Sequence, residues 1–182
     1  MKDQGIGAIA VRPTTLIAWN LQGIAFQSLL VTLAVALPAV AHLTGLPVRY
    51  LLPMHAPIIL AGLVYGWRGG LATGLLSPLT SFLISGMPFP PMILPMTLEL
   101  ATYGLMAGLL RENARLSSFM SVAAAALAGR IIFVLTVLLA GSVKTPFVPY
   151  LQAAMLPGLI AMAGQIVLLP FVAKWWVDRA RK

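Results

Sequence analysis

The sequence contains no cysteine and few charged residues. Without cysteine, disulfides, thiolate metal sites and cysteine nucleophiles are excluded. Four acidic residues and two histidines in 182 residues are too few for most metal or hydrolytic centres, and no Ser–His–acid grouping is apparent. A Gly-x-x-x-x-Gly-Lys-Ser/Thr loop for ATP is also missing. These absences predict a protein that is not an enzyme and holds neither a metal nor a cofactor.

Hydrophobic residues make up 60% of the chain, and the mean hydropathy is +0.96. A helix needs about 20 apolar residues to cross a bilayer. The apolar runs therefore predict an all-α integral membrane protein, with one membrane domain over residues 1–182. We expect six transmembrane helices at about 25–41, 51–65, 71–84, 92–110, 119–140 and 151–172.

Glycine and proline mark the breaks between these runs. Residues 66–70 (Gly-Trp-Arg-Gly-Gly) predict a tight turn, and the proline-rich residues 85–91 predict a non-helical loop. The second span opens with Pro53 and Pro57, which predicts irregular backbone at its start. Such backbone is tolerated at membrane depth only where protein or a water-filled cavity covers it.

Basic residues dominate the charge, giving a net charge of +8. They lie in the short gaps between apolar runs and at the C-terminus, which is typical of topology signals rather than of a nucleic-acid surface. With six spans, one side would hold Lys2, Arg12, Arg68, Arg111, Arg115, Lys174, Arg179, Arg181 and Lys182. Arg49 and Lys144 would lie on the other side. We therefore expect both termini in the cytoplasm of a multi-pass protein, in a bacterial or archaeal cytoplasmic membrane.

Glu99 and Arg130 are opposite charges, each inside a long apolar run. A charge at the bilayer centre costs about 2.5–3.5 kcal/mol on insertion scales, so it rarely persists without a partner or a function. At 1.5 Å per residue, both lie about 16–20 Å above the inner face, and we expect their side chains to meet. The pair could staple two helices together, or it could line a cavity that binds a polar solute.

Three neighbouring residues extend this candidate site. Met96 and Tyr103 share the helical face of Glu99, and methionine with an aromatic ring suits an adaptable pocket for a flat heterocycle. Methionines at this spacing are also typical of plain packing. His55, near the outer end of the second span, could contact a ligand or cap an irregular turn.

Several motifs together resemble the substrate-binding (S) components of energy-coupling-factor (ECF) vitamin transporters. They are the run from Leu52 to Gly62 (LPMHAPIILAG), Ser77-Pro78, Ser85-Gly86-Met87-Pro88, Glu99-Leu100-Ala101-x-Tyr103-Gly104 and Gly129-Arg130. They cover about the middle half of the chain, in an order and spacing that fit the family.

The resemblance implies a bundle with both termini inside that captures a water-soluble vitamin or precursor in its outer half. It also implies partners: a transmembrane coupling subunit and two cytoplasmic ATPases. Carried over by position, Glu99, Arg130 and the loop containing Ser85 and Met87 become ligand-binding candidates. Glu99 would take a cationic or hydrogen-bond-donating ring nitrogen. Arg130 would bind a carboxylate or phosphate, or else hold Glu99 ionised.

One departure concerns the Ala-x-x-x-Ala docking motif typical of the family's first helix. The nearby registers here read Ala34-x-x-x-Pro38 and Ala36-x-x-x-Val40. Thiamin or its pyrimidine part, pantothenate, a flavin and a cobalamin fragment all stay open as ligands. The alternative is a structural or assembly subunit that binds no solute, in which Glu99 and Arg130 form a staple.

Overall fold

The structure, a computed structural model, describes residues 15–141 and 146–182. Every regular element in these ranges is helical, which confirms the predicted all-α fold. The elements are α1 (Leu21–Leu43), α2 (Val48–Leu51), α3 (His55–Ser85), α4 (Pro90–Glu112), α5 (Ser118–Ala140), α6 (Phe147–Met155) and α7 (Gly158–Ala180). Five segments are long and apolar enough to cross a membrane, with α3 counted as one segment and α6–α7 as another.

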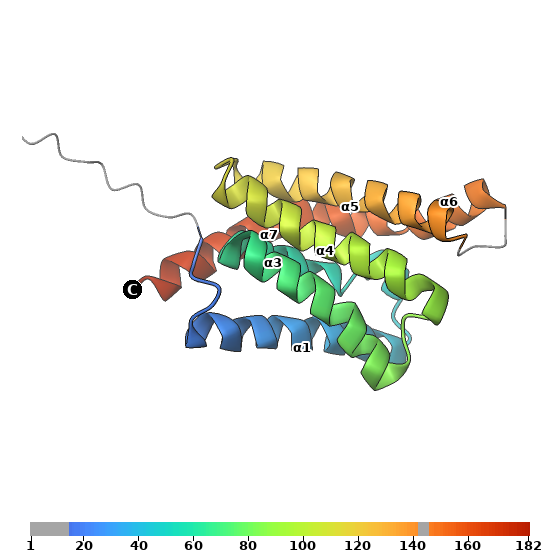
Figure 1. The fold of residues 1–182 in the computed structure, drawn as a ribbon, viewed down its shortest axis with the longest axis horizontal. Helices are drawn as coiled ribbons and strands as arrows, with labels where there is room; N and C mark the ends of the chain where they lie inside the picture. The colour runs from blue at the N-terminus through green and yellow to red at the C-terminus, as the bar shows by residue number, and fades with distance from the viewer. Residues whose placement is uncertain (1–14, 142–145) are drawn as a thin grey trace, which may run out of the picture.

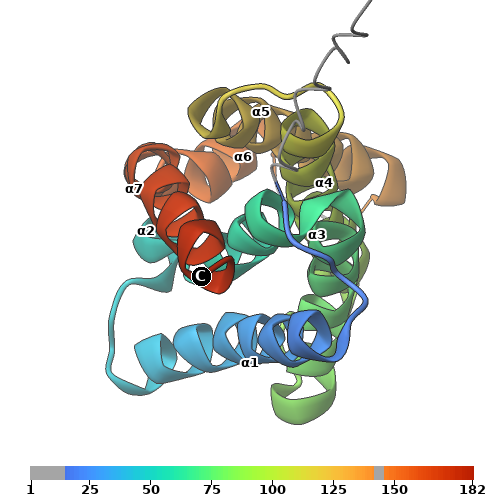
Figure 2. The ribbon, with the colours of Figure 1, turned by 90° about the vertical axis from the view of Figure 1, so that its left-hand side faces the viewer.

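The long helices form an elongated bundle (Figures 1 and 2). The start of α1, the connection from α4 to α5 and the end of α7 lie at one end of the bundle (Figure 1). We call this the basic end, because Arg68, Arg111, Arg115 and Arg179 belong to it. The opposite end holds α2, the loop between α3 and α4, and α6. Helix α1 thus starts at the end of the bundle where α7 finishes.

Helix α3 consists of two arms that meet at Gly66, whose backbone is non-helical (φ 72°, ψ −172°). A Cβ on Gly70 would lie 2.7 Å from the Cα of Gly62, although eight residues of straight helix would separate them by about 12 Å. The chain therefore reverses direction at Gly66. Glycine suits this position because it adopts a positive φ without steric cost. The expected turn over 66–70 is wrong in extent, since residues 67–70 are already helical.

The first arm of α3, residues 55–65, occupies the centre of the bundle. All its residues except Ala56 are buried, and at about 16 Å it is shorter than a full crossing. Before it, Leu52 adopts a left-handed backbone (φ 45°). The side chain of Gln165, on α7, donates a hydrogen bond to the Leu52 carbonyl (3.3 Å). The predicted irregular backbone is thus confirmed, and protein covers it.

Two other predicted boundaries were wrong. The expected last span, 151–172, is divided near Pro157 into α6 and α7, and α7 continues to Ala180. The expected loop over 85–91 is shorter, because Ser85 ends α3, while Pro90 and Pro91 form the first turn of α4. Proline is well tolerated there, since the N–H that it lacks has no partner within the helix.

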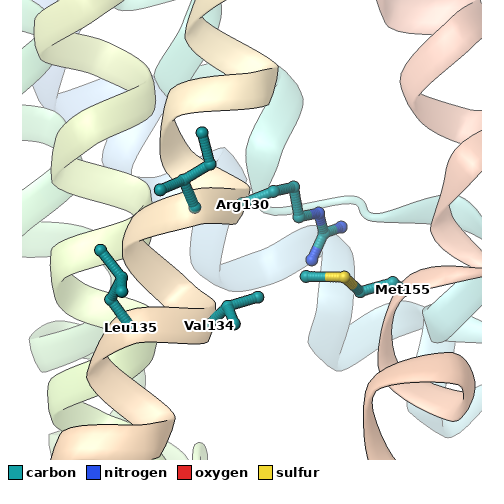
Figure 3. A pocket seen from close by; sticks show the side chains of 5 residues that line it. Arg130, Val134, Leu135 and Met155 are labelled. Atoms are coloured by element: carbon teal, nitrogen blue, oxygen red, sulfur yellow. The ribbon is translucent and has the colours of Figure 1, made fainter. Parts of the chain in front are cut away.

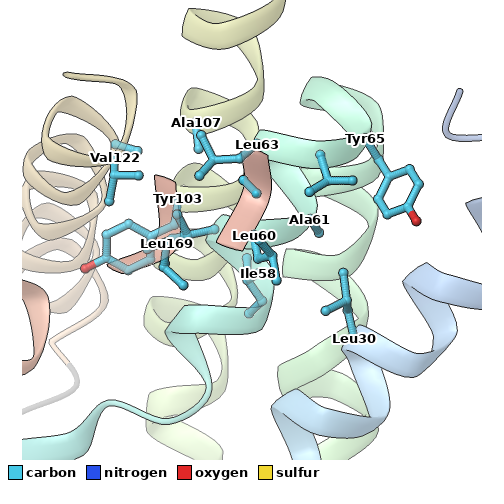
Figure 4. Close-up of a cluster of buried hydrophobic side chains, with 14 of the residues drawn as sticks. Leu30, Ile58, Leu60, Ala61, Leu63, Tyr65, Tyr103, Ala107, Val122 and Leu169 are labelled. Atoms are coloured by element: carbon cyan, nitrogen blue, oxygen red, sulfur yellow. The ribbon is translucent and has the colours of Figure 1, made fainter. Parts of the chain in front are cut away.

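The hydrophobic core surrounds the first arm of α3 (Figure 4). Ile58 and Leu63 on this arm pack with Leu30 of α1, Val122 of α5 and Leu169 of α7. Against α4 the contact is between backbones: Gly62 and Gly70 both meet the carbonyl of Gly104. This close packing fixes α4, and with it Glu99, relative to the start of α3.

Candidate functional site: a buried cluster around Glu99

Glu99 lies in the middle of α4 and is 3% exposed. Its Oε1 accepts a hydrogen bond from the Tyr103 hydroxyl (2.8 Å), one turn further along the same helix. The same oxygen lies 3.0 Å from Nη1 of Arg130 on α5. The predicted meeting of the two intramembrane charges is confirmed. Because the carboxylate has two partners, the cost of burying it is partly offset.

Gly129 determines how α5 approaches this pair. A Cβ at this position would lie 2.5 Å from Cε1 and 2.9 Å from Cζ of the Tyr103 ring. With hydrogen in its place, the aromatic ring lies directly against α5 at Gly129, and the neighbouring Arg130 reaches Glu99. The Gly129-Arg130 pair was noticed in the sequence as a motif, but this steric role could not be read there.

His55 is the first residue of α3, and it is 6% exposed. Its Nε2 lies 3.9 Å from Glu99 Oε1, and its ring centroid lies 5.1 Å from that of Tyr103. Neither ring nitrogen has a hydrogen-bond partner among the described residues. The imidazole therefore does not cap the preceding turn, where the His55 backbone N–H donates to the Leu52 carbonyl (3.1 Å).

Gln165 was assigned to helix packing by default, yet it belongs to this neighbourhood. It is 8% exposed, and its Nε2 donates to the Leu52 carbonyl, which also receives the His55 N–H. Its Oε1 has no hydrogen-bond partner in the described chain. An amide deep in an apolar run was the signal available in the sequence. We call His55, Glu99, Tyr103, Arg130 and Gln165 the polar cluster; it draws on α3, α4, α5 and α7.

The other predicted ligand residues lie apart from the cluster or at its margin. Ser85 is exposed, and its hydroxyl donates to the Ser81 carbonyl (2.8 Å), as serine in a helix commonly does. Met87 is exposed in the loop before α4, and Glu99 lies about 14 Å further along that helix from Pro90. Met96 is half-buried one turn before Glu99. The structure does not bring Ser85 and Met87 to the polar cluster.

A groove adjoins the outer side of Arg130. It has a volume of about 310 Å³ and is lined by Arg130, Ile131, Val134 and Leu135 of α5 and by Met155 of α6. Figure 3 shows the guanidinium extending from α5 toward Met155. The Arg130 side chain is 20% exposed, and its Nη2 would lie 3.1 Å from a Cβ placed on Gly158. Arg130 thus contacts buried Glu99 and also contributes to the apolar lining of an open groove.

The fold and the cluster define an integral membrane protein with a charged, hydrogen-bonding centre inside its helical bundle. The family model described as "ECF transporter, substrate-specific component" matches residues 22–178, and the chain belongs to that family. It is therefore the substrate-capture subunit of an ECF transporter, and the resemblance seen in the sequence is confirmed. No curated protein and no solved structure matches the chain.

Proposed function

We propose that this subunit captures a small water-soluble vitamin or vitamin precursor at the polar cluster and delivers it to an ECF coupling subunit that two cytoplasmic ATPases energise. The observation that carries this proposal is the set of buried polar atoms left unpaired in the polar cluster: both ring nitrogens of His55, near the ion pair, and Oε1 of Gln165. A solute with donors and acceptors would satisfy them.

Energetics favour binding over a purely structural role. Leaving a buried donor or acceptor unpaired costs about 1–3 kcal/mol for each group. A staple needs only Glu99 and Arg130, which already contact each other at 3.0 Å. It gives no reason for placing an unpaired imidazole 3.9 Å from the same carboxylate. A bound solute gives that reason, because it would offset these costs when it binds.

The expected orientation follows from charge. Arg68, Arg111, Arg115 and Arg179 at the basic end favour the cytoplasmic side under the positive-inside rule. The opposite end, with α2, α6 and the loop between α3 and α4, would then face outward. Capture from outside and contact with the ATPase-bearing module from inside both fit this arrangement.

Ligand affinity in detergent tests the proposal. Native mass spectrometry of the purified protein identifies a co-purified small molecule, and calorimetry then measures its Kd. We expect Glu99→Gln and His55→Phe each to weaken binding at least tenfold, about 1.4 kcal/mol. Met87→Ala, in the loop away from the cluster, is the matched control and should change Kd less than twofold. Folded Glu99 and His55 variants that both stay within threefold of the parent would contradict binding at this cluster.

A purely structural role for the Glu99–Arg130 pair is the second candidate, and one observation favours it: Glu99 is already satisfied by Tyr103 and Arg130. It predicts that replacing both charges with apolar residues preserves assembly and uptake, as buried ion pairs often tolerate. Solute capture predicts that assembly survives and uptake is lost.

A further inference from the structure

A second pocket lies at the basic end, away from the polar cluster. It has a volume of about 150 Å³ and is enclosed by the start of α1, the segment before it, the end of the first arm of α3 and the end of α7. Three of the residues that line it, Asn20, Gln22 and Tyr65, are polar. Tyr65 lies about 15 Å along α3 from His55, so this pocket is separate from the proposed capture site.

The hydroxyl of Tyr65 is a buried donor without an acceptor. Tyr65 is 3% exposed, and its hydroxyl has no hydrogen-bond partner among the described residues. Trp176 of α7 lies beside this hydroxyl, but an indole N–H only donates and cannot accept the hydroxyl proton. Figure 4 shows the Tyr65 ring extending from α3 toward α1. A buried donor is costly to leave unpaired, so an acceptor in this pocket would be favoured.

The N-terminal end of α1 forms another part of the pocket wall. The N–H groups of a helix's first turn have no acceptor within the helix. Asn20 is the N-cap residue, and its side-chain oxygen accepts from the Gly23 N–H (2.6 Å). The N–H groups of Leu21 and Gln22 remain for an acceptor outside the helix. With the positive end of the helix dipole, they favour an anion.

The end of α7 adds positive charge beside the pocket. Ala180 lines it, and residues 174–182 contain four basic residues and one acidic residue, a net charge of +3. This charge exceeds the roughly half negative charge that the dipole places at the end of α7. Nη2 of Arg181 donates to the carbonyl of Thr15 (3.5 Å), which directly precedes Leu16 in the pocket wall. The hydroxyl, the helix N-terminus and the net charge all favour the same kind of occupant, an anion.

The surroundings of the pocket indicate which anion is available there. Ile17, Leu21 and Ile24 are exposed along the start of α1, at 71%, 87% and 46%. Trp175 and Lys174 on α7 are the residue types that mark a membrane–water interface, where the phosphates of phospholipids lie. The volume is below the range of about 300–1,000 Å³ for small-molecule sites, so the pocket suits one headgroup phosphate and not a nucleotide.

We propose that this pocket binds the phosphate of an anionic phospholipid from the leaflet at the basic end. The Tyr65 hydroxyl and the first N–H groups of α1 donate to the phosphate oxygens, and the acyl chains cover Ile17, Leu21 and Ile24. The bound lipid would bridge the start of α1 and the end of α7. This site goes beyond the proposed function and does not depend on which solute the polar cluster captures.

Lipid titrations test the requirement for phosphate. Phosphatidylglycerol, diacylglycerol with the same acyl chains, and inorganic phosphate are each added to the delipidated protein in detergent, and native mass spectrometry measures binding. We expect phosphatidylglycerol to bind at least ten times more tightly than diacylglycerol and to resist displacement by millimolar inorganic phosphate. Equal affinities for the two lipids would overturn the proposal. Displacement by inorganic phosphate would assign the pocket to a free anion and overturn the lipid assignment.

Two variants test the location of the site. Tyr65→Phe removes only the hydroxyl, and Tyr50→Phe on exposed α2 is its control. Gln22→Glu places a negative charge in the pocket, and Asn113→Asp makes the same charge change at an exposed position of the basic end outside it. We expect both pocket variants to weaken phosphatidylglycerol binding at least fivefold and both controls to stay within twofold. Pocket variants that bind this lipid like the parent would overturn the assignment.

Thermal unfolding without lipid separates lipid binding from a packing role. Tyr65→Phe removes no hydrogen bond, and a glutamate in the first turn of α1 is favoured by the helix dipole. Neither variant should therefore lower the thermal midpoint in lipid-free detergent, while added phosphatidylglycerol should raise the midpoint of the parent more than theirs. Variants that melt lower without lipid and gain the same shift with it would overturn the proposal. Unchanged lipid affinity with loss of a co-purifying coupling subunit would assign this surface to a protein partner and also overturn it.

Discussion

The interface between α3 and α4 and the short helix α6 are the two extremes of packing in this molecule. At the interface, Gly62 and Gly70 contact the backbone of Gly104, and Gly108 contacts that of Trp67. Helix α6 has no buried residue. Its Tyr150 hydroxyl reaches the Met92 sulfur at 3.5 Å. One region is held backbone to backbone, whereas the other lies on the surface of the bundle.

This difference in packing predicts different stabilities for the α3–α4 interface and for α6. In lipid, burial of apolar surface does not drive helices together, and close packing at small residues is one of the main forces that does. The glycine-lined contact between α3 and α4 is of this kind. Helix α6 lacks contacts of this kind, and segments with few buried contacts open at low free-energy cost. The groove beside Arg130 has Met155 of α6 as one wall. We therefore expect the basic end to be the more rigid one and α6 to open at a lower free-energy cost.

The largest predicted effect comes from breaking the rigid region. In Gly104→Ala, the new methyl would overlap the backbone of Gly70, which cannot move without separating the two arms of α3. We expect a stability loss of about 1–3 kcal/mol or more, seen as a lower thermal midpoint and poor monodisperse yield. Gly164→Ala on α7 is the control, because a Cβ there has open space. If the two variants melt together, the glycine contact is not what holds the helices.

The second-largest effect on stability is expected at the Glu99–Arg130 ion pair. Glu99→Leu leaves Arg130 without its carboxylate in the bundle and should cost about 3–5 kcal/mol, because a buried charge loses its compensation. The double variant Glu99→Leu/Arg130→Met should recover most of that stability while losing ligand binding. Thermal unfolding and calorimetry on the same samples separate the two properties. A double variant as unstable as the single one would show that the pair is not the stabilising unit.

Structural features that follow from the chemistry of a single residue could be predicted from the sequence. Charges inside apolar runs had to be paired, and simple depth arithmetic brought Glu99 to Arg130. It failed where the outcome depends on contact between distant segments. Residues 67–70 look like a turn in isolation, but Gly70 is helical and packs on Gly62 and Gly104. Gln165 looked like a packing residue until the fold placed it on the Leu52 carbonyl.

A moderate effect is expected at the turn where the two arms of α3 meet. The Glu112 carboxylate accepts from the Trp67 N–H (3.3 Å), at the start of the second arm, and lies 4.0 Å from Arg68 Nη1. Glu112→Gln weakens the interaction with the N-terminal end of this arm, and we expect a loss of about 0.5–1 kcal/mol, since the side chain is partly exposed. Asp178→Asn, the same charge change at an exposed position, should be neutral. Equal thermal midpoints for the two variants would argue against this role.

The smallest effect on stability, and the sharpest on local motion, is expected in α6. Tyr150→Phe removes the hydroxyl contact with Met92, and the thioether sulfur is a weak acceptor, so the thermal midpoint should hardly change. Hydrogen exchange should nevertheless quicken over residues 147–155 and stay unchanged over 100–108, because only the first segment loses a contact. If exchange quickened in both segments, α6 and the glycine-packed core would open together as one cooperative unit. Confinement to α6 would make it the separately opening wall of the groove beside Arg130.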